Sequence, residues 1–165
     1  MLHAWLFTQS GIPVIYSGDE IGQLNDYTYK KDPEKWADSR YLHRGKFPWE
    51  KVEKKDPISM RIFNALRVME KLRAEHAIFS GQAGVETMET GSRSVLGILR
   101  YLGMDQHLRA YFNFSEQTQH FWTMPDDEAE RYVDLFSGKT MKELGDQLEP
   151  YGYRWYLEQP KAVEA

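Results

Sequence analysis

Two adjacent carboxylates near the N-terminus, Asp19 and Glu20, are the most conspicuous candidates for acid–base chemistry in this chain. They follow a short apolar, β-branched run at residues 12–16, which predicts a strand buried on both faces. Adjacent residues on an extended strand point to opposite faces. We therefore expect that Asp19 and Glu20 do not both face one bond.

A long polar and aromatic segment, residues 19–56, supplies further candidates, namely Asp26, Tyr27 and Arg40. Its dense aromatic content argues against disorder, and long irregular segments in compact domains are usually functional. The guanidinium of Arg40 offers several fixed donors, which suit hydroxyl and carboxylate partners. The alternatives for Arg40 are full exposure to solvent or an ion pair with Asp38. The segment is therefore interpreted as an ordered binding loop.

Composition narrows the classes of function. The 165 residues include no cysteine, the 5 histidines lack metal-ligand spacing, and no Gly-rich phosphate loop or serine nucleophile elbow is present. We therefore expect no metal and no cofactor. A net charge of −4 without a basic patch argues against nucleic-acid binding, and no apolar run is long enough to span a membrane. No secretory signal is visible, so a cytoplasmic location is expected over a secreted one.

The elements that must position these residues follow from periodicity. A short helix is expected over residues 1–9, and a longer one from Pro57 to about Glu75 with Asp56 as its N-cap. The apolar face of the longer helix comprises Ile62, Leu66, Met69 and Leu72.

The sequence pattern changes from helical spacing to short strand-like runs near residues 79–81, where we expect a domain boundary. Short strand-like runs separated by turn residues then predict an antiparallel sheet or small sandwich. An acidic turn is expected at residues 125–130 and a frayed tail at 161–165. The predicted strands are residues 95–102, 107–113, 119–124, 132–135 and 153–157.

The run GIPVIYSGDEIG at residues 11–22 resembles the pattern at the eighth barrel strand of the α-amylase superfamily, glycoside hydrolase family 13. Residues 23–27 and 38–44 are similar to the loop after that strand in amylosucrases. The resemblance implies an α+β fragment. Residues 1–79 would be the last β/α unit of a TIM (β/α)8 barrel, residues 80–160 an antiparallel β-sandwich, and residues 161–165 a tail. A complete barrel needs roughly 250 residues, more than this chain has.

The family chemistry is retaining transfer or hydrolysis at a glycosidic bond by a pair of carboxylates. The family's three catalytic carboxylates lie on strands four, five and seven, which precede the equivalent of Met1. The resemblance thus implies no catalytic residue in this chain, structural or supporting roles for Asp19 and Glu20, and no activity for the chain alone. It places Arg40 beside the acceptor side of the pocket, with Asp26 and Tyr27 lining the same pocket.

Arg100 corresponds to an arginine that in amylosucrases pairs with an aspartate at the base of the sucrose pocket. An unpaired buried arginine is costly, so in this chain Arg100 is expected to be exposed or to find another partner. The alternative is an ordinary outward-facing strand residue.

Sucrose or an α-glucan is the partner that the resemblance implies. Two other functions remain open. The chain could be a non-catalytic carbohydrate-binding or structural β module, or part of a neopullulanase or maltogenic amylase, whose motifs residues 47–50 also resemble. A single strand and helix would leave apolar faces uncovered. Residues 1–75 are therefore expected either to pack onto the β-sandwich in a non-barrel way or to pair with another chain, which would be self-association through the barrel segment.

Overall fold

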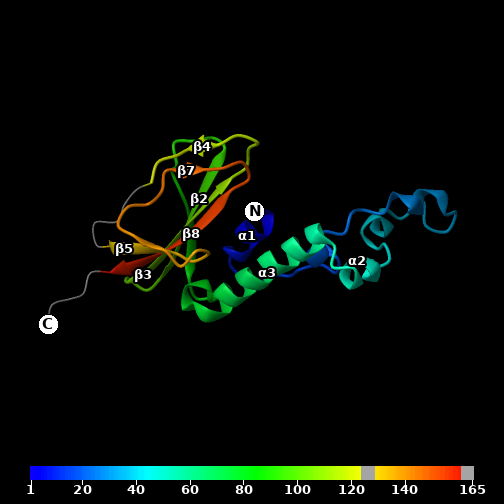
Figure 1. The fold of residues 1–165 in the computed structure, drawn as a ribbon, viewed down its shortest axis with the longest axis horizontal. Helices are drawn as coiled ribbons and strands as arrows, with labels where there is room; N and C mark the ends of the chain where they lie inside the picture. The colour runs from blue at the N-terminus through cyan, green and yellow to red at the C-terminus, as the bar shows by residue number, and fades with distance from the viewer. Residues whose placement is uncertain (124–128, 161–165) are drawn as a thin grey trace. The chain divides into compact units, whose positions relative to one another are not determined.

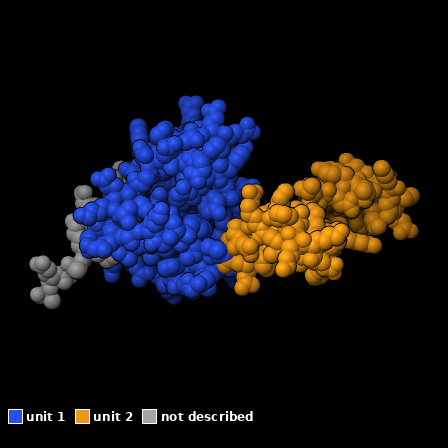
Figure 2. Space-filling view, in the orientation of Figure 1, with its two compact units in different colours: residues 1–13, 68–165 blue, residues 14–67 orange. Residues whose placement is uncertain are grey.

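The computed structural model describes residues 1–123 and 129–160. The chain divides into two compact units, residues 14–67 and residues 1–13 with 68–165, coloured orange and blue in Figure 2. The expected tail at 161–165, most of the acidic turn and the last residue of the run 119–124 lie outside the described residues.

The larger unit contains the sheet, and its described strand pairs are all antiparallel (Figure 1). The six-stranded sheet has the order β1-β2-β3-β8-β5-β6, and β4 pairs with β7 in a small second sheet. This confirms the predicted antiparallel β fold. The bounds are β1 Gly84–Met88, β2 Val95–Leu102, β3 Gln106–Asn113, β4 Gln119–His120, β5 Ala129–Asp134, β6 Thr140–Met141, β7 Gln147–Leu148 and β8 Tyr153–Pro160.

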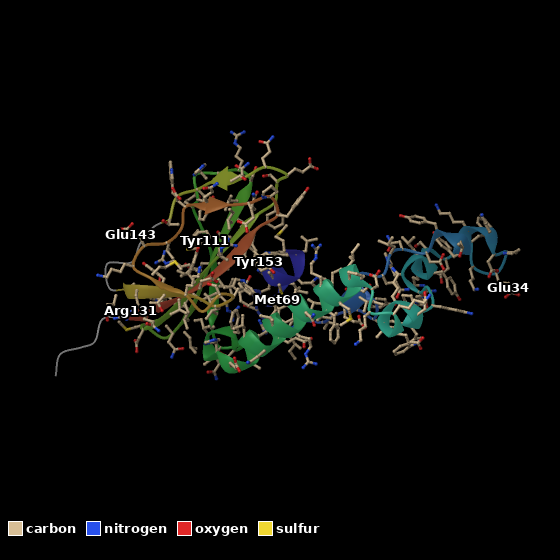
Figure 3. The ribbon with its side chains drawn as sticks, viewed as in Figure 1. Glu34, Met69, Tyr111, Arg131, Glu143 and Tyr153 are labelled. Carbon is tan, nitrogen blue, oxygen red and sulfur yellow. The ribbon has the colours of Figure 1, made fainter. Side chains whose placement is uncertain are left out.

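The six-stranded sheet is buried on both faces of its central strands. Phe112 on β3 pairs with Tyr153 on β8, so these two share one face, whereas the adjacent Tyr111 lies on the other. Figure 3 labels Tyr111 and Tyr153 among the side chains of the sheet. On that second face, the ring of Tyr111 packs against the ring of Phe121, with the ring centroids 4.7 Å apart. It belongs to an apolar cluster of Val95, Tyr111, Phe121, Tyr132, Leu148 and Tyr156. The small sheet therefore covers this face, as expected of a sandwich.

The opposite face packs against residues that precede the sheet. Trp155 is fully buried there, and its ring centroid lies 5.0 Å from that of Phe79. Phe79 ends a short 3-10 helix, Ala77–Phe79, that follows α3, Pro57–Glu75. The bounds of α3 are as predicted. The carboxylate of Asp56 accepts a hydrogen bond of 3.0 Å from the amide of Ser59, which confirms its role as N-cap.

The two units do not follow the boundary predicted at residues 79–81. The first helix, α1 (Leu2–Phe7), and the C-terminal part of α3 group with the sheet. The reason is packing, because Ala4 and Phe7 on α1 and Met69 on α3 are buried. The assignment of residues 1–79 to a barrel and 80–160 to a β domain stays a prediction.

The predicted strand at residues 12–16 is absent, and this expectation was wrong for the structure. The segment has no ladder partner within residues 1–123 and 129–160. Ile12 and Val14 are 91% and 77% exposed. A buried parallel strand needs a neighbouring strand on each side. Every strand of the two described sheets pairs only with strands of its own sheet. The segment after it forms α2, Trp49–Glu53, and three 3-10 helices, Asp19–Ile21, Tyr27–Lys31 and Ser39–His43.

Candidate functional site

The smaller unit contains a polar cavity of about 680 Å³ within the long loop that the sequence marked as functional. This volume lies in the range of small-molecule sites, roughly 300–1,000 Å³. Two 3-10 helices, 27–31 and 39–43, contribute side chains to its wall. The lining residues are Gln23, Leu24, Asn25, Asp26, Thr28, Tyr29, Asp32, Lys35, Tyr41, Arg44, Gly45 and Lys46.

Asp26 is the residue around which this cavity is organised. Its carboxylate accepts hydrogen bonds from the amide and hydroxyl of Thr28, at 2.8 and 2.6 Å, and so caps the 3-10 helix that follows. Its own amide donates to the carbonyl of Leu42 at 2.8 Å, which ties the two 3-10 helices together. The Thr28 hydroxyl, and then its amide, lower the pKa of Asp26. The cavity therefore holds an ionised carboxylate at neutral pH.

The segment that ends the loop also lines the cavity. The side-chain amide nitrogen of Gln23 donates to the carbonyl of Lys46 at 3.1 Å. Gly45 allows this close approach, because a Cβ there would lie 3.2 Å from both the Cβ of Asp26 and the side-chain nitrogen of Gln23. The cavity depends on the absence of a side chain at residue 45.

An ion pair and two aromatic rings complete the rim. Lys35 lies 2.7 Å from the carboxylate of Asp32 and 5.8 Å from the ring centroid of Tyr41. The hydrogen bond between Asp32 and Lys35 lowers the pKa of Asp32 and raises that of Lys35. Tyr29 and Arg44 add further donors. The lining thus contains donors, acceptors and flat aromatic surfaces, a combination that suits a polyhydroxylated ligand.

The structure separates the three predicted loop residues. Asp26 lines the cavity, whereas Tyr27 is 61% exposed and Arg40 also lies outside the lining. Arg40 forms a bidentate pair with Asp38, at 2.8 Å from Nε and 2.7 Å from Nη2. The hydrogen bonds from Arg40 lower the pKa of Asp38 to about 2. The alternative of an Asp38 partner is therefore the observed one, and ligand contact by Arg40 and Tyr27 stays a prediction.

Sequence reasoning missed Tyr29, Tyr41 and Arg44 as lining residues. The aromatic density of the loop was the available signal. It could not say which ring faces inward, because 3-10 helices and irregular turns have no simple alternation.

Arg100 lies in the other unit, on β2, and is fully buried. Its guanidinium donates to the carbonyls of Thr8, Ile78 and Ser80, at 2.8, 2.8 and 3.0 Å. Burial, and then the charge of Arg73, lower the pKa of Arg100 to about 10. Arg100 is therefore buried with three backbone carbonyls as its partners, which agrees with the expectation that it would find another partner. The alternative of an outward-facing strand residue is wrong.

Asp19 and Glu20 lie in a 3-10 turn, so the strand argument made for them does not apply. The carboxylate of Glu20 accepts a hydrogen bond of 2.7 Å from the amide of Gly18, whose φ is 103°. Glu20 thereby stabilises a left-handed glycine turn, which is a structural role.

Two general findings concern only the part of the chain that the structure describes. No group of three or more His, Cys, Asp or Glu side chains could hold a metal ion. No helix there has the length and apolar character that a membrane crossing requires.

Known proteins resemble the chain over almost its full length. No protein-family model matches. A curated trehalose synthase from Thermus thermophilus is 27% identical over 198 residues, a match that covers 100% of this chain and 20% of that protein. The chain therefore spans about a fifth of the length of this relative.

Solved structures share the fold. A trehalose-6-phosphate hydrolase from Bacillus licheniformis gives a TM-score of 0.68 at 22% identity, covering 95% of this chain and 38% of that one. An Anoxybacillus α-amylase gives 0.64 at 17%, covering 98% and 32%. An isomaltulose synthase from Erwinia rhapontici, in complex with D-glucose, gives 0.65 at 19%, covering 96% and 37%. These solved structures share the fold of the chain, and the curated relative resembles it in sequence.

Proposed function

We propose that this chain is the C-terminal portion of an α-amylase-family enzyme that acts on α-glucosidic sugars, and that residues 23–46 bind a sugar. The observation that carries this proposal is the cavity of about 680 Å³ lined by a carboxylate, an ion pair, two tyrosines and an arginine. Sugar hydroxyls both donate and accept hydrogen bonds, and the ring presents an apolar C–H face to an aromatic side chain. The lining supplies a partner for each of these features.

The chain's part in the reaction is binding. A retaining mechanism needs two carboxylates roughly 5–5.5 Å apart across the scissile bond. Glu20 is engaged by the Gly18 amide, and Asp26 by Thr28. The carboxylate of Asp38 is held by Arg40. These groups order the loop, so we expect the isolated chain to release no fructose from sucrose above the buffer rate.

Within the family, we propose an amylosucrase-like specificity, with sucrose as the glucosyl donor and an α-glucan as acceptor. The support is the resemblance of residues 23–27 and 38–44 to the corresponding amylosucrase loop. In this proposal Asp26 contacts the sugar directly, whereas Tyr27 and Arg40 contact it from outside the cavity.

The test is a titration of the ¹⁵N-labelled 165-residue chain with sucrose and with maltotriose, followed through the side-chain amides of Gln23 and Asn25. Two matched pairs distinguish the cavity from the outer face of the loop. Tyr29→Ala and Arg44→Gln alter the lining, whereas Tyr27→Ala and Arg40→Gln alter residues outside it. We expect the first two to weaken binding about tenfold, equivalent to about 1.4 kcal/mol, and the second two to weaken it less, because Tyr27 and Arg40 contact the sugar from outside the cavity.

Loss of binding in Tyr27→Ala and Arg40→Gln alone would move the site to the outer face. The absence of any saturable shift with both sugars would remove the proposal.

A further inference from the structure

An exposed tryptophan, Trp122, lies in the larger compact unit (residues 1–13 and 68–165), which we call the β unit. It is distant in sequence from the cavity lined by residues 23–46. Trp122 follows β4 and is 71% exposed, whereas the preceding Phe121 is 4% exposed and belongs to the core cluster. Both backbones are held. The backbone amide of Phe121 donates to the backbone carbonyl of Asp146 at 2.9 Å, and that of Trp122 donates to the backbone carbonyl of Thr90 at 2.7 Å. Because side chains alternate along an extended segment, Phe121 points into the sandwich and Trp122 points out.

Gly91 supports one face of the indole. A Cβ on Gly91 would lie 2.6, 2.8 and 2.9 Å from Cδ2, Cε2 and Cε3 of Trp122. These atoms surround the ring fusion, so the glycine faces the plane of the ring and not its edge. The φ of Gly91 is 67°, a conformation that favours glycine. The opposite face of the ring is directed to solvent.

The turn that carries Gly91 is well ordered. The hydroxyl of Thr90, which is buried, donates to the carbonyls of Val95 at 2.8 Å and Ser92 at 3.1 Å. The hydroxyl of Ser92 donates to the side chain of Gln119 at 3.3 Å, which joins this turn to β4. The indole therefore rests on a fixed backbone, and binding a ligand to it requires little ordering.

The surroundings of the ring are polar. The exposed residues Glu89 and Arg93 flank Gly91 in sequence, and the exposed His120 lies on the same outer side of its strand as Trp122. A protein or lipid partner would need a continuous apolar patch, which this arrangement does not provide. A pyranose ring needs a single flat apolar surface for its C–H face and polar groups for its hydroxyls.

We propose that Trp122 and Gly91 form a second carbohydrate-binding site, on the β unit, which stacks one glucosyl unit of an α-glucan. The choice of α-glucan rests on the proposed function. The site is distinct from the loop cavity, because its residues belong to the other compact unit. It would hold a chain-like sugar without taking part in bond cleavage.

The experiment is a titration of the ¹⁵N-labelled 165-residue chain with maltoheptaose, observed through the indole N–H signal of Trp122. The absence of that signal in Trp122→Phe assigns it. We expect a saturable shift of the indole signal, and binding about tenfold weaker in Trp122→Ala, which is followed through the backbone amide of Gly91 in both chains. Gly91→Ala should also weaken binding, since its new Cβ displaces the ring. Phe114→Ala, at another exposed aromatic residue of the same unit (43% exposed), serves as the matched control and should bind as the parent chain does.

The results for the two sites are separable. Shifts of the Gln23 and Asn25 amides with an unmoved Trp122 indole would overturn this inference and leave the proposed function standing. A Trp122 shift without movement of those amides would support this inference and count against the loop cavity. Equal binding of cellohexaose, which is β-linked, would overturn the assignment to α-glucans. Circular dichroism of each variant is the control for retention of the fold.

Discussion

Arg100 on β2 and Thr8 at the end of α1 are joined by a hydrogen bond of 2.8 Å between the guanidinium and a backbone carbonyl. The same side chain also holds the carbonyls of Ile78 and Ser80, so one buried cation connects three segments that are distant in sequence. Arg73 adds hydrogen bonds to the carbonyls of Phe7 and Gly11. The two arginines thereby satisfy carbonyls at and beyond the C-terminus of α1.

Replacing Arg100 should destabilise the chain. Its lowered pKa of about 10 corresponds to an unfavourable environment of about 3 kcal/mol for the charge, which Arg100→Met would relieve. The substitution would also remove the donor from the buried carbonyls of Thr8 and Ile78, at about 1–3 kcal/mol each, whereas the Ser80 carbonyl keeps its hydrogen bond from the amide of Ala83. The second effect is the larger, so we expect a net loss of about 1 kcal/mol, measured by urea denaturation.

Arg93→Met is the matched control, because Arg93 is exposed on a turn, and its effect should stay within about 0.5 kcal/mol. Equal stability of Arg100→Met and the parent chain would show that the three hydrogen bonds contribute no net stability.

Asn113 organises the end of β3. It is fully buried, and its side-chain nitrogen Nδ2 donates to the backbone carbonyls of Gln117, Glu149 and Leu148, at 2.7, 2.9 and 3.3 Å. Asn113→Asp replaces these donations with a buried carboxylate facing carbonyl oxygens. We expect a loss of about 3 kcal/mol at pH 7 in thermal or urea unfolding.

The same change at the exposed Asn64 on α3 should have little effect. Burial would raise the pKa of the new carboxyl at residue 113, so the deficit of that variant should shrink as the pH falls. A deficit independent of pH would contradict this explanation.

The pair of Asp38 and Arg40 predicts a titration. The pKa of Asp38 is lowered from 3.8 to about 2, first by the side-chain hydrogen bond from Arg40 and then by its amide. A folded-state pKa below the unfolded value means that the contribution to stability is present above pH 3.8 and is lost as the pH falls through about 2. NMR of the Asp38 carboxyl should show this midpoint.

Arg40→Gln should move the Asp38 midpoint back toward 3.8, although the amide hydrogen bond remains. Arg44→Gln should move it much less, because the charge of Arg44 is the smallest of the causes. An ordinary Asp38 midpoint in the parent chain would mean that the pair does not form in solution.

Gly45 predicts how the loop cavity can be closed. A Cβ at this position meets Asp26 and Gln23 at 3.2 Å, so Gly45→Val should narrow the cavity and weaken sugar binding about tenfold in the titration described above. Gly81→Val is the matched control, because nothing lies within 4 Å of a Cβ there. Unchanged binding in Gly45→Val would indicate that the sugar lies outside this cavity.

The elements predicted best were those with strong local signals. The helix over Pro57–Glu75 has a regular apolar face, and its buried residues Leu66 and Met69 belong to the predicted set. The strand Val95–Leu102 was also predicted with its observed bounds. The short strands β1, β6 and β7 were missed, because two- and five-residue segments carry little periodicity and depend on their partners.

The loop residues show the same division. Asp38 and Asp26 precede 3-10 helices as capping side chains, a role that short polar residues take through local hydrogen bonds. The choice of Tyr29 over Tyr27 for the cavity wall depends on how two irregular segments fold against each other.

The amino-acid sequence by itself determined the antiparallel β unit, the long helix and the location of the polar loop, because each follows from local spacing of apolar, turn and capping residues. The tertiary structure alone decided three things. It left residues 12–16 without a strand partner among the described residues, gave Arg100 three carbonyls, and directed Trp122 outward over Gly91. Each of these depends on groups that are remote in sequence, and a local pattern carries no information about which distant backbone will arrive beside it.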